Sequence, residues 1–356
     1  MAAISIPPAQ NWVGNNGPWS SFGLQIGSPA QEVAVLPATS KSNIWAVQND
    51  SCSSMIAVGD CEAFFGGLYE PENSTSFVDL KRSDQEPYFE LPFRPEQSLG
   101  YEGNAQIGTD NVRFQDGRIL PKQVISVFAE TDPFLATGLL GLNDQPLNIT
   151  SSFDNYTSPL STLRKAEVMP SSFWAYNAGA RYLESRPLAS LTLGGYDAGR
   201  GGELKDALKV NMAPSDFRDL VISVERISIG ERTVEPKIEA YIDSVIPELW
   251  LPESACKIFE DAFDLQWNES AQMYLLDDQH LDQLFSKPLA KVNFTLADPA
   301  DTSNSINISF SYGAFGLQAR YPLAGIQDDS VLYYFPLKRA NESTGYYLGH
   351  AFLQEA

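Results

Sequence analysis

Asp243 stands in a stretch that could carry acid chemistry, and a second, similar stretch has an alanine in its place. The two stretches are VAVLPATSKSNIW at 33–45 and IEAYIDSVIPELW at 238–250. When their tryptophans are aligned, Asp243 falls on Ala38. Two neighbouring carboxylates can share one proton and act as acid and base, but the two aligned positions supply only one, Asp243. Asp243 could therefore be a residual catalyst, a ligand anchor, or an acid hydrogen-bonded to nearby backbone.

Each stretch is followed by an apolar segment that contains glycine, GLLGL at 138–142 and YYLGHAFL at 346–353. The two pairs occur in the same order and at nearly equal spacing, which suggests a duplicated lobe. Between them lie many short β-branched and aromatic runs bounded by Gly, Pro, Asn and Asp. These runs predict strands, whereas helical spacing is found mainly at 252–265 and 158–168. The chain is therefore predicted to be mostly β.

The composition excludes several kinds of function. The chain has 24 basic and 45 acidic residues among 356, with a formal net charge of −21. Such a charge argues against binding to nucleic acid or to an anionic membrane surface. With only His280 and His350 present, a Ser-His-Asp or Cys-His triad is not expected. No cofactor or metal motif is found, and the acidic run at 275–285 is predicted to be a solvated helix face.

Sequons and cysteines predict an oxidising compartment. Eight Asn-x-Ser/Thr sequons are candidates for N-glycosylation: Asn49, Asn73, Asn148, Asn155, Asn268, Asn293, Asn307 and Asn341. Cys52 and Cys61 bracket a polar loop and could form a disulfide, and Cys256 is then the odd cysteine. Residues 1–12 contain no apolar leader and no run is long enough to span a membrane. We therefore expect a trimmed ectodomain, secreted or displayed at the cell surface.

Together these stretches resemble the pepsin-like aspartic proteases, in particular the secreted or surface-anchored relatives from ascomycete fungi. The resemblance covers most of the chain and includes WSSFGLQIGSPAQEV, TGLLGL, SLTLGGYD, AYIDSVIPELWLP and the last segment, which ends in YYLGHAFLQEA. It implies a bilobal acid-protease fold with two β-barrel-like lobes that flank a peptide-binding cleft. We expect the N-terminal lobe to span residues 1–190 and the C-terminal lobe residues 191–356.

The family motifs can be transferred residue by residue. The first motif, Asp-Thr-Gly, lies over Ala38, Thr39 and Ser40, and the second over Asp243, Ser244 and Val245. The hydroxyls of Thr39 and Ser244 remain, but Ser40 and Val245 carry side chains where the family has glycine. The resemblance also makes Tyr101, in LGYEGNAQIG, the candidate for the tyrosine of the flap that covers a ligand.

One catalytic acid is thus missing from the transferred motifs, and the sequence predicts that the chain is not an enzyme. We expect a pseudoprotease that binds a peptide, a glycan or another protein through its cleft or surface. Two alternatives stay open. The chain could be a weak acid endopeptidase that uses Asp243 with an unidentified acid, such as Glu32 or Asp50. It could also be a structural spacer in a membrane-anchored protein.

Overall fold

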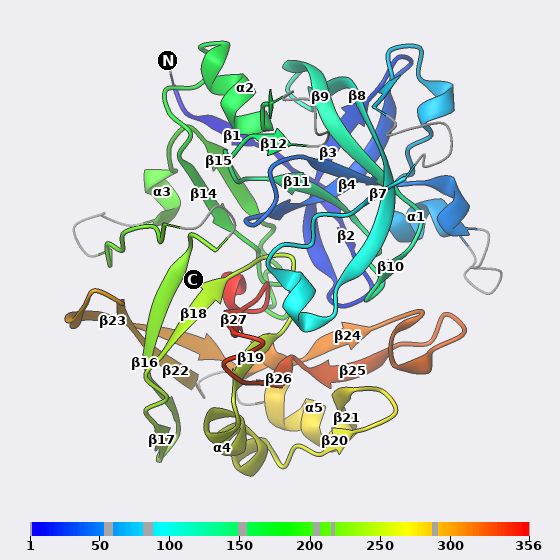
Figure 1. Cartoon of the computed structure of the whole chain (residues 1–356). Helices are drawn as coiled ribbons and strands as arrows, with labels where there is room; N and C mark the ends of the chain where they lie inside the picture. Colours follow the sequence, from blue (N-terminus) through cyan, green and yellow to red (C-terminus); the bar gives the residue numbers. More distant parts are fainter. Residues whose placement is uncertain are drawn as a thin grey trace. The chain divides into compact units, whose positions relative to one another are not determined.

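The computed structural model describes residues 2–52, 60–80, 88–148, 155–201, 207–214, 218–286 and 291–355. These residues form two compact units in which strands predominate, as the sequence predicted (Figure 1). Unit 1 comprises Met1–Gly14, Trp19–Tyr176 and Leu188–Asp197, and unit 2 comprises Asn15–Pro18, Asn177–Pro187 and Ala198–Ala356. The predicted boundary between residues 190 and 191 falls within strand β15, Ser190–Leu193, which belongs to unit 1.

Within its described residues, unit 1 is built on a ten-stranded sheet with the path β10-β8-β9-β5-β11-β4-β3-β2, to which β6 and β7 are added through β8. The strands are β2 Pro8–Val13, β3 Trp19–Ile26, β4 Gln31–Ala38, β5 Ile44–Val47, β6 Val78–Asp79, β7 Phe89–Glu90, β8 Glu102–Phe114, β9 Ile119–Phe128, β10 Thr131–Asp132 and β11 Gly138–Gly141. A smaller sheet has the order β1-β15-β14, with β1 Ile4–Ile6 and β14 Trp174–Asn177. The short strands β12 Leu147–Asn148 and β13 Asn155–Tyr156 pair with each other.

Unit 2 has an eight-stranded sheet with the path β23-β22-β16-β18-β27-β19-β26, and β17 is paired with β16. A second sheet in the same part of the chain has the order β20-β21-β25-β24. The strands are β16 Val221–Ile229, β17 Arg232–Val234, β18 Ile238–Ile242, β19 Leu249–Pro252, β20 Trp267–Asn268, β21 Met273–Leu276, β22 Lys291–Asp298, β23 Asp301–Ser311, β24 Leu317–Ala319, β25 Leu332–Phe335, β26 Leu337–Ala340 and β27 Tyr346–Leu348.

Helices are short and lie at the edges of these sheets. The α-helices are α1 Cys61–Phe65, α2 Pro159–Lys165, α3 Ala198–Gly201, α4 Glu253–Phe263 and α5 Asp278–Phe285. The 3₁₀ helices are η1 Asn49–Cys52, η2 Pro71–Asn73, η3 Glu96–Leu99, η5 Tyr312–Phe315, η6 Leu323–Gly325 and η7 Phe352–Gln354. The helices expected near 158–168 and 252–265 are confirmed as α2 and α4. In α4 the buried residues Ala255, Cys256, Phe259 and Phe263 form one face, as the apolar spacing predicted.

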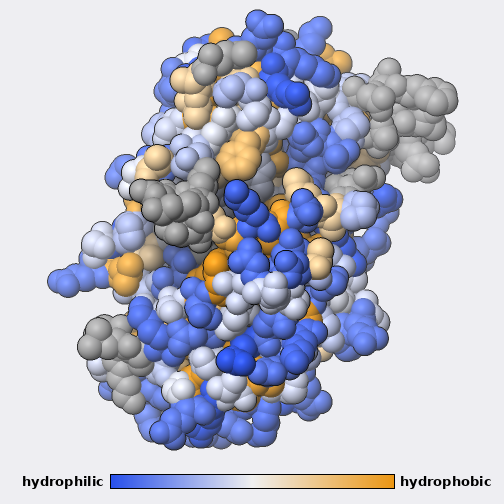
Figure 2. Space-filling model, turned by 90° about the vertical axis from the view of Figure 1, so that its left-hand side faces the viewer, coloured by the Kyte–Doolittle hydropathy of each residue, from blue (hydrophilic) through white to orange (hydrophobic). Residues whose placement is uncertain are grey.

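Apolar side chains fill the interior of each unit. In β3, buried Phe22, Leu24 and Ile26 alternate with less buried Gly23 and Gln25, which is the period of a strand with one face on a core. In unit 2 the rings of Phe259, Phe294, Phe310, Phe315 and Phe335 form a continuous aromatic cluster. The molecular face in Figure 2 is mainly hydrophilic with small apolar patches, in keeping with the acidic composition.

The duplication read from the sequence is confirmed by the topology. In unit 1, β11 lies between β4, which is parallel to it, and β5, which is antiparallel. In unit 2, β27 lies in the same way between β18 and β19. Gly141 ends β11 and Gly349 follows β27, and a Cβ on either would come within 2.5 Å of a backbone carbonyl oxygen of the neighbouring loop. Each glycine therefore lets its chain pass closely under the loop that carries the transferred motif.

Candidate active site

Ala38 ends strand β4 and is fully buried. Its carbonyl accepts a hydrogen bond from the Leu142 amide at 2.9 Å, and Gly141 lies opposite it in the parallel register. Thr39 and Ser40 follow as a turn, and each is only 4% exposed. A methyl group neither donates nor accepts a proton, so any acid chemistry at this loop must come from another residue.

A carboxylate from a different segment reaches this loop. Glu96, at the start of η3, accepts a hydrogen bond from Ser40 Oγ on Oε1 at 2.6 Å and forms an ion pair with Lys41 Nζ on Oε2 at 2.5 Å. The Lys41 and Glu96 side chains are 1% and 0% exposed. Burying two charges is costly unless they are paired and hydrogen-bonded, and this pair meets both conditions. Glu96 is therefore an integral part of the loop that begins at Ala38.

Aromatic rings surround the ion pair. Lys41 Nζ lies 5.6 Å from the ring centroids of both Trp45 and Phe93, a distance suited to cation–π attraction. Phe93 also contacts Tyr101, at 5.6 Å between ring centroids, and Tyr101 is 5% exposed. The structure thus places Tyr101 just before β8 and packed on the segment that covers Lys41. Its role as a ligand contact stays a prediction.

Asp243 occupies the corresponding loop of unit 2, between β18 and β19. It is 1% exposed, its Oδ1 accepts a hydrogen bond from the Val245 amide at 3.0 Å, and its own amide donates to the Leu348 carbonyl at 3.2 Å. Neither Ser40 nor Val245 adopts a positive φ, so neither backbone position requires the glycine of the family motif. The backbone thus accommodates a side chain at both positions.

His350 fixes the Asp243 loop from the other side. Its Nδ1 lies 2.9 Å from the Ser244 carbonyl, so Nδ1 carries the proton that it donates. His350 is 1% exposed, and burial lowers its pKa from 6.5 to about 4, although the Ser244 contact acts in the opposite direction. Nearby Glu248 is also buried, and the loss of solvent raises its pKa. The imidazole is therefore neutral through most of the mildly acidic range.

Sequence reasoning missed Glu96, Lys41 and His350. A signal for Lys41 was available: it lies inside an apolar, strand-bounded segment, and a buried ammonium needs an acidic partner. Nothing in the sequence identified Glu96 as that partner. The acids named instead, Glu32 and Asp50, are both exposed, and Glu32 Oε1 accepts a hydrogen bond from Gln25.

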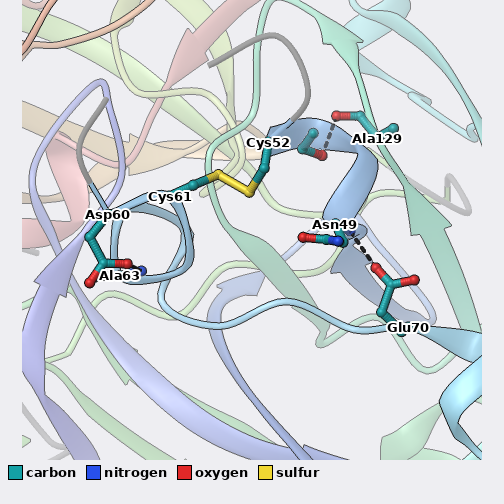
Figure 3. The surroundings of a disulfide bond; sticks show 8 residues. Asn49, Cys52, Asp60, Cys61, Ala63, Glu70 and Ala129 are labelled. Carbon is teal, nitrogen blue, oxygen red and sulfur yellow. Dashed lines mark hydrogen bonds between the residues drawn. A yellow bond between two sulfur atoms is a disulfide. The ribbon is translucent and has the colours of Figure 1, made fainter. Parts of the chain in front are cut away.

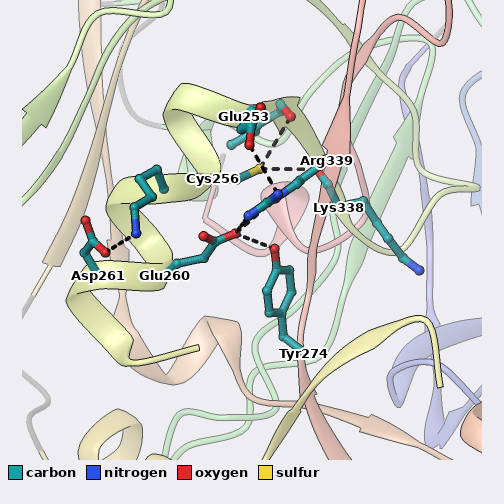
Figure 4. Close-up of polar contacts among 9 residues, drawn as sticks. Glu253, Cys256, Glu260, Asp261, Tyr274, Lys338 and Arg339 are labelled. Atoms are coloured by element: carbon teal, nitrogen blue, oxygen red, sulfur yellow. Dashed lines mark hydrogen bonds and ion pairs between the residues drawn. The ribbon is translucent and has the colours of Figure 1, made fainter. Parts of the chain in front are cut away.

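The cysteines are placed as the sequence suggested. Cys52 and Cys61 form a disulfide that joins η1 to α1 beside the Asp60 cap of α1 (Figure 3). Cys256 is a free, buried thiol on α4 whose Sγ lies near the Leu251 and Lys338 carbonyls (Figure 4). Burial raises its pKa to about 12, so the thiol is unreactive at ordinary pH.

The sequons lie at positions of different exposure. Asn49, Asn73, Asn307 and Asn341 are exposed, and Asn268 and Asn293 are half-buried. The side chains of Asn148 and Asn155 lie outside what the structure describes. Glycosylation of these residues stays a prediction.

Two further features bear on function. Within the described ranges, no cluster of three or more His, Cys, Asp or Glu side chains is placed to hold a metal ion. None of the described helices combines the length and apolar character needed to cross a membrane.

Comparison with known proteins identifies relatives of the whole chain. A model of the family described as eukaryotic aspartyl protease matches residues 22–356. Secreted aspartic protease 8 of Candida albicans is 24% identical over 268 residues, which cover 73% of this chain and 59% of that protein. Secreted aspartic protease 7 of the same organism is 26% identical over 187 residues, 51% of this chain and 28% of that protein. The chain thus spans less than two thirds of the length of these relatives.

These findings contradict the prediction that the chain is not an enzyme, because the matching family and the relatives are proteases. That prediction counted acids only at the motif positions, where Ala38 and Asp243 stand. The fold brings Glu96 onto the same loop through Ser40, and motif counting cannot detect such a contact. With a match to residues 22–356, the chain belongs to the eukaryotic aspartyl protease family.

Proposed function

We propose that the chain is a secreted acid endopeptidase in which Asp243 is a catalytic carboxylate. The observation that carries the proposal is the retained acid itself, buried in the loop between β18 and β19 and oriented by the Val245 amide and the His350 contact to Ser244. The similarity to secreted aspartic proteases supports both the reaction and the secreted location.

Hydrolysis by this chemistry needs one carboxylate that takes a proton from the attacking water and one acid that gives a proton to the peptide carbonyl. Asp243 supplies one of these two groups. Glu96 is bound by Lys41 and Ser40 and supports the loop that begins at Ala38.

The test is a cleavage assay on the secreted protein, with a denatured protein substrate and a peptide library between about pH 2.5 and about pH 6.5. Asp243→Asn should lower kcat by at least about 100-fold. Asp50→Asn, an exposed acid of unit 1, should leave kcat unchanged. Melting temperatures measured in parallel separate a lost catalyst from a lost fold.

Undiminished cleavage by Asp243→Asn, or no cleavage by the unsubstituted protein, overturns the proposed activity.

A second candidate function is recognition of a peptide, a glycan or another protein, as the sequence predicted. The observation that favours it is Ala38, which puts a fully buried methyl group where the resemblance implies an acid. Panels of peptides and glycans should then raise the melting temperature, since a ligand that binds only the folded state stabilises it. If no member of either panel shifts it, this candidate fails.

A further inference from the structure

Unit 1 contains a cavity of about 530 Å³ on the side of the sheet away from its apolar core. Residues of β2, β3, β4 and α1 line the cavity. Figure 1 shows these four elements in unit 1. The volume is within the range of small-ligand sites. None of the residues transferred from the family motif lines this cavity, so the site is distinct from the one described above.

Small residues create the hollow. Gly23 on β3 faces Ala34 on β4 across the antiparallel pair, and this leaves the middle of the floor without bulk. The turn after α1 contributes Gly66, whose carbonyl accepts a hydrogen bond from the Ala34 amide at 2.8 Å. A Cβ on Gly23 would lie 2.2 Å from Gln115 Nε2, so a larger residue there would displace that amide.

A buried hydroxyl in the floor has no partner among the described residues. Ser21 lies two residues before Gly23 on the same face of β3, is 0% exposed and lines the cavity, and its Oγ has no hydrogen-bond partner in the part of the chain that the structure describes. Leaving a buried hydroxyl unsatisfied costs about 1–3 kcal/mol, which a ligand that bonds to it would relieve. Ser21 is thus an independent indication that the cavity accepts a polar group.

The charged side chains around the cavity indicate which kind of ligand group it can bind. Three carboxylates line it, from Glu32, Asp60 and Glu62, and the described lining contains no lysine, arginine or histidine. Four side-chain amides add further acceptors and donors, those of Gln10, Asn11, Gln25 and Gln115. An anion would be repelled, and the lining residues that the structure describes include no aromatic ring on which a flat apolar ligand could stack.

We propose that this cavity binds a guanidinium or ammonium group, with Ser21 Oγ and the carboxylates of Glu32 and Glu62 as acceptors. A guanidinium offers five donors in a planar fork and no acceptor, which matches a lining rich in carboxylate and amide oxygens. The chemistry would suit the side chain of an arginine or lysine, free or within a peptide.

The experiment is calorimetric titration of the secreted, disulfide-intact protein with arginine amide, with citrulline amide, and with a short peptide that contains one arginine. Citrulline has the shape of arginine without its charge. Arginine amide should bind and citrulline amide should bind at least about 10-fold more weakly, with added salt lowering the arginine affinity. Tighter binding of the peptide than of arginine amide would identify a polypeptide as the source of the group.

Three variants connect the binding to the cavity. The double variant Glu32→Gln/Glu62→Gln keeps the shape of the lining and should reduce arginine affinity by about 10-fold or more. Glu72→Gln, at an exposed acid elsewhere in unit 1, is the matched control and should bind normally. Ser21→Ala should weaken binding while leaving the melting temperature equal or higher, because it removes an unsatisfied group.

Absence of arginine binding at millimolar concentration overturns the proposal. So does equal binding of arginine and citrulline, or full affinity in the double variant. None of these results depends on peptide hydrolysis.

Discussion

The two motif loops share one topology but satisfy their buried polar groups in different ways. In unit 1 the loop after Ala38 has no acid of its own and receives a carboxylate from η3, paired with Lys41. In unit 2 the loop retains Asp243 and is supported by a neutral imidazole, His350, together with backbone amides. The same strand frame thus holds a charged pair in one unit, and in the other it holds Asp243 in a loop that an uncharged imidazole supports.

The strand arrangement therefore does not determine the side-chain chemistry of the loop that it carries. The frame depends on backbone contacts that are alike in both units, such as those of Gly141 and Gly349. The chemistry depends on which side chain fills the space left beneath the turn. We therefore expect the two loops to differ in their response to charge removal and to pH.

The largest difference should follow from removing the ammonium of unit 1. Lys41→Met leaves the Glu96 carboxylate buried without its counter-charge, and we expect the free energy of unfolding in urea to fall by about 3–5 kcal/mol. The double variant Lys41→Met/Glu96→Leu should recover most of that loss, because no charge is then buried.

An exposed pair provides the control for this prediction. Lys257 and Asp261 on α4 lie 2.6 Å apart with side chains 62% and 47% exposed (Figure 4). Lys257→Met should therefore cost less than about 1 kcal/mol. If Lys41→Met costs no more than this control, the buried pair does not hold the unit 1 loop.

The second prediction concerns pH and unit 2. Because the pKa of His350 is lowered from 6.5 to about 4 in the folded chain, the unfolded chain binds more protons between these values. Stability should thus decrease as the pH falls from about 6.5 to about 4, by on the order of 3 kcal/mol from this residue. Below about pH 4 the folded imidazole is also protonated, and this contribution no longer changes.

His350→Asn should flatten the dependence while retaining a donor for the Ser244 carbonyl. The measurement is the difference in unfolding free energy between the variant and the parent at several pH values. His280→Asn, at the half-buried N3 position of α5, should keep the parental slope. An unchanged slope in His350→Asn would show that another group sets the acid response of unit 2.

The sequence was sufficient to predict the structural features that depend on regular residue spacing. Strand content, helices α2 and α4 and the duplicated frame were all predictable, because periodicity and glycine positions act locally. The Cys52–Cys61 disulfide was also within reach, since the two cysteines are close in the chain. The family followed from residues in both motif loops and from the segments around them.

The site was less predictable because its decisive contacts join distant segments. Glu96 and Lys41 are separated by β5, α1, β6, β7 and the segments between them, and no local pattern connects the two. The glycines of the family motif were no guide to the backbone here, because neither Ser40 nor Val245 adopts a positive φ. The arginine-binding cavity has no motif at all, since strand pairing and not sequence spacing brings its lining together.

The smallest expected difference is between the two tryptophans that align in the motif stretches. Trp45 is fully buried, donates from Nε1 to Asn43 Oδ1 at 3.0 Å and packs edge-on against Phe93 at 5.0 Å, whereas Trp250 is half-buried. Trp45→Phe should cost about 2 kcal/mol of unfolding free energy, because it leaves both a cavity and an unpaired amide oxygen. Trp250→Phe should cost less than about 1 kcal/mol. Trp45 also lies against Lys41, so the same substitution can be made in the Lys41→Met/Glu96→Leu background. If the loss of unfolding free energy disappears in that background, Trp45 stabilises the protein by supporting the ion pair. If the loss persists, Trp45 stabilises it through the apolar core.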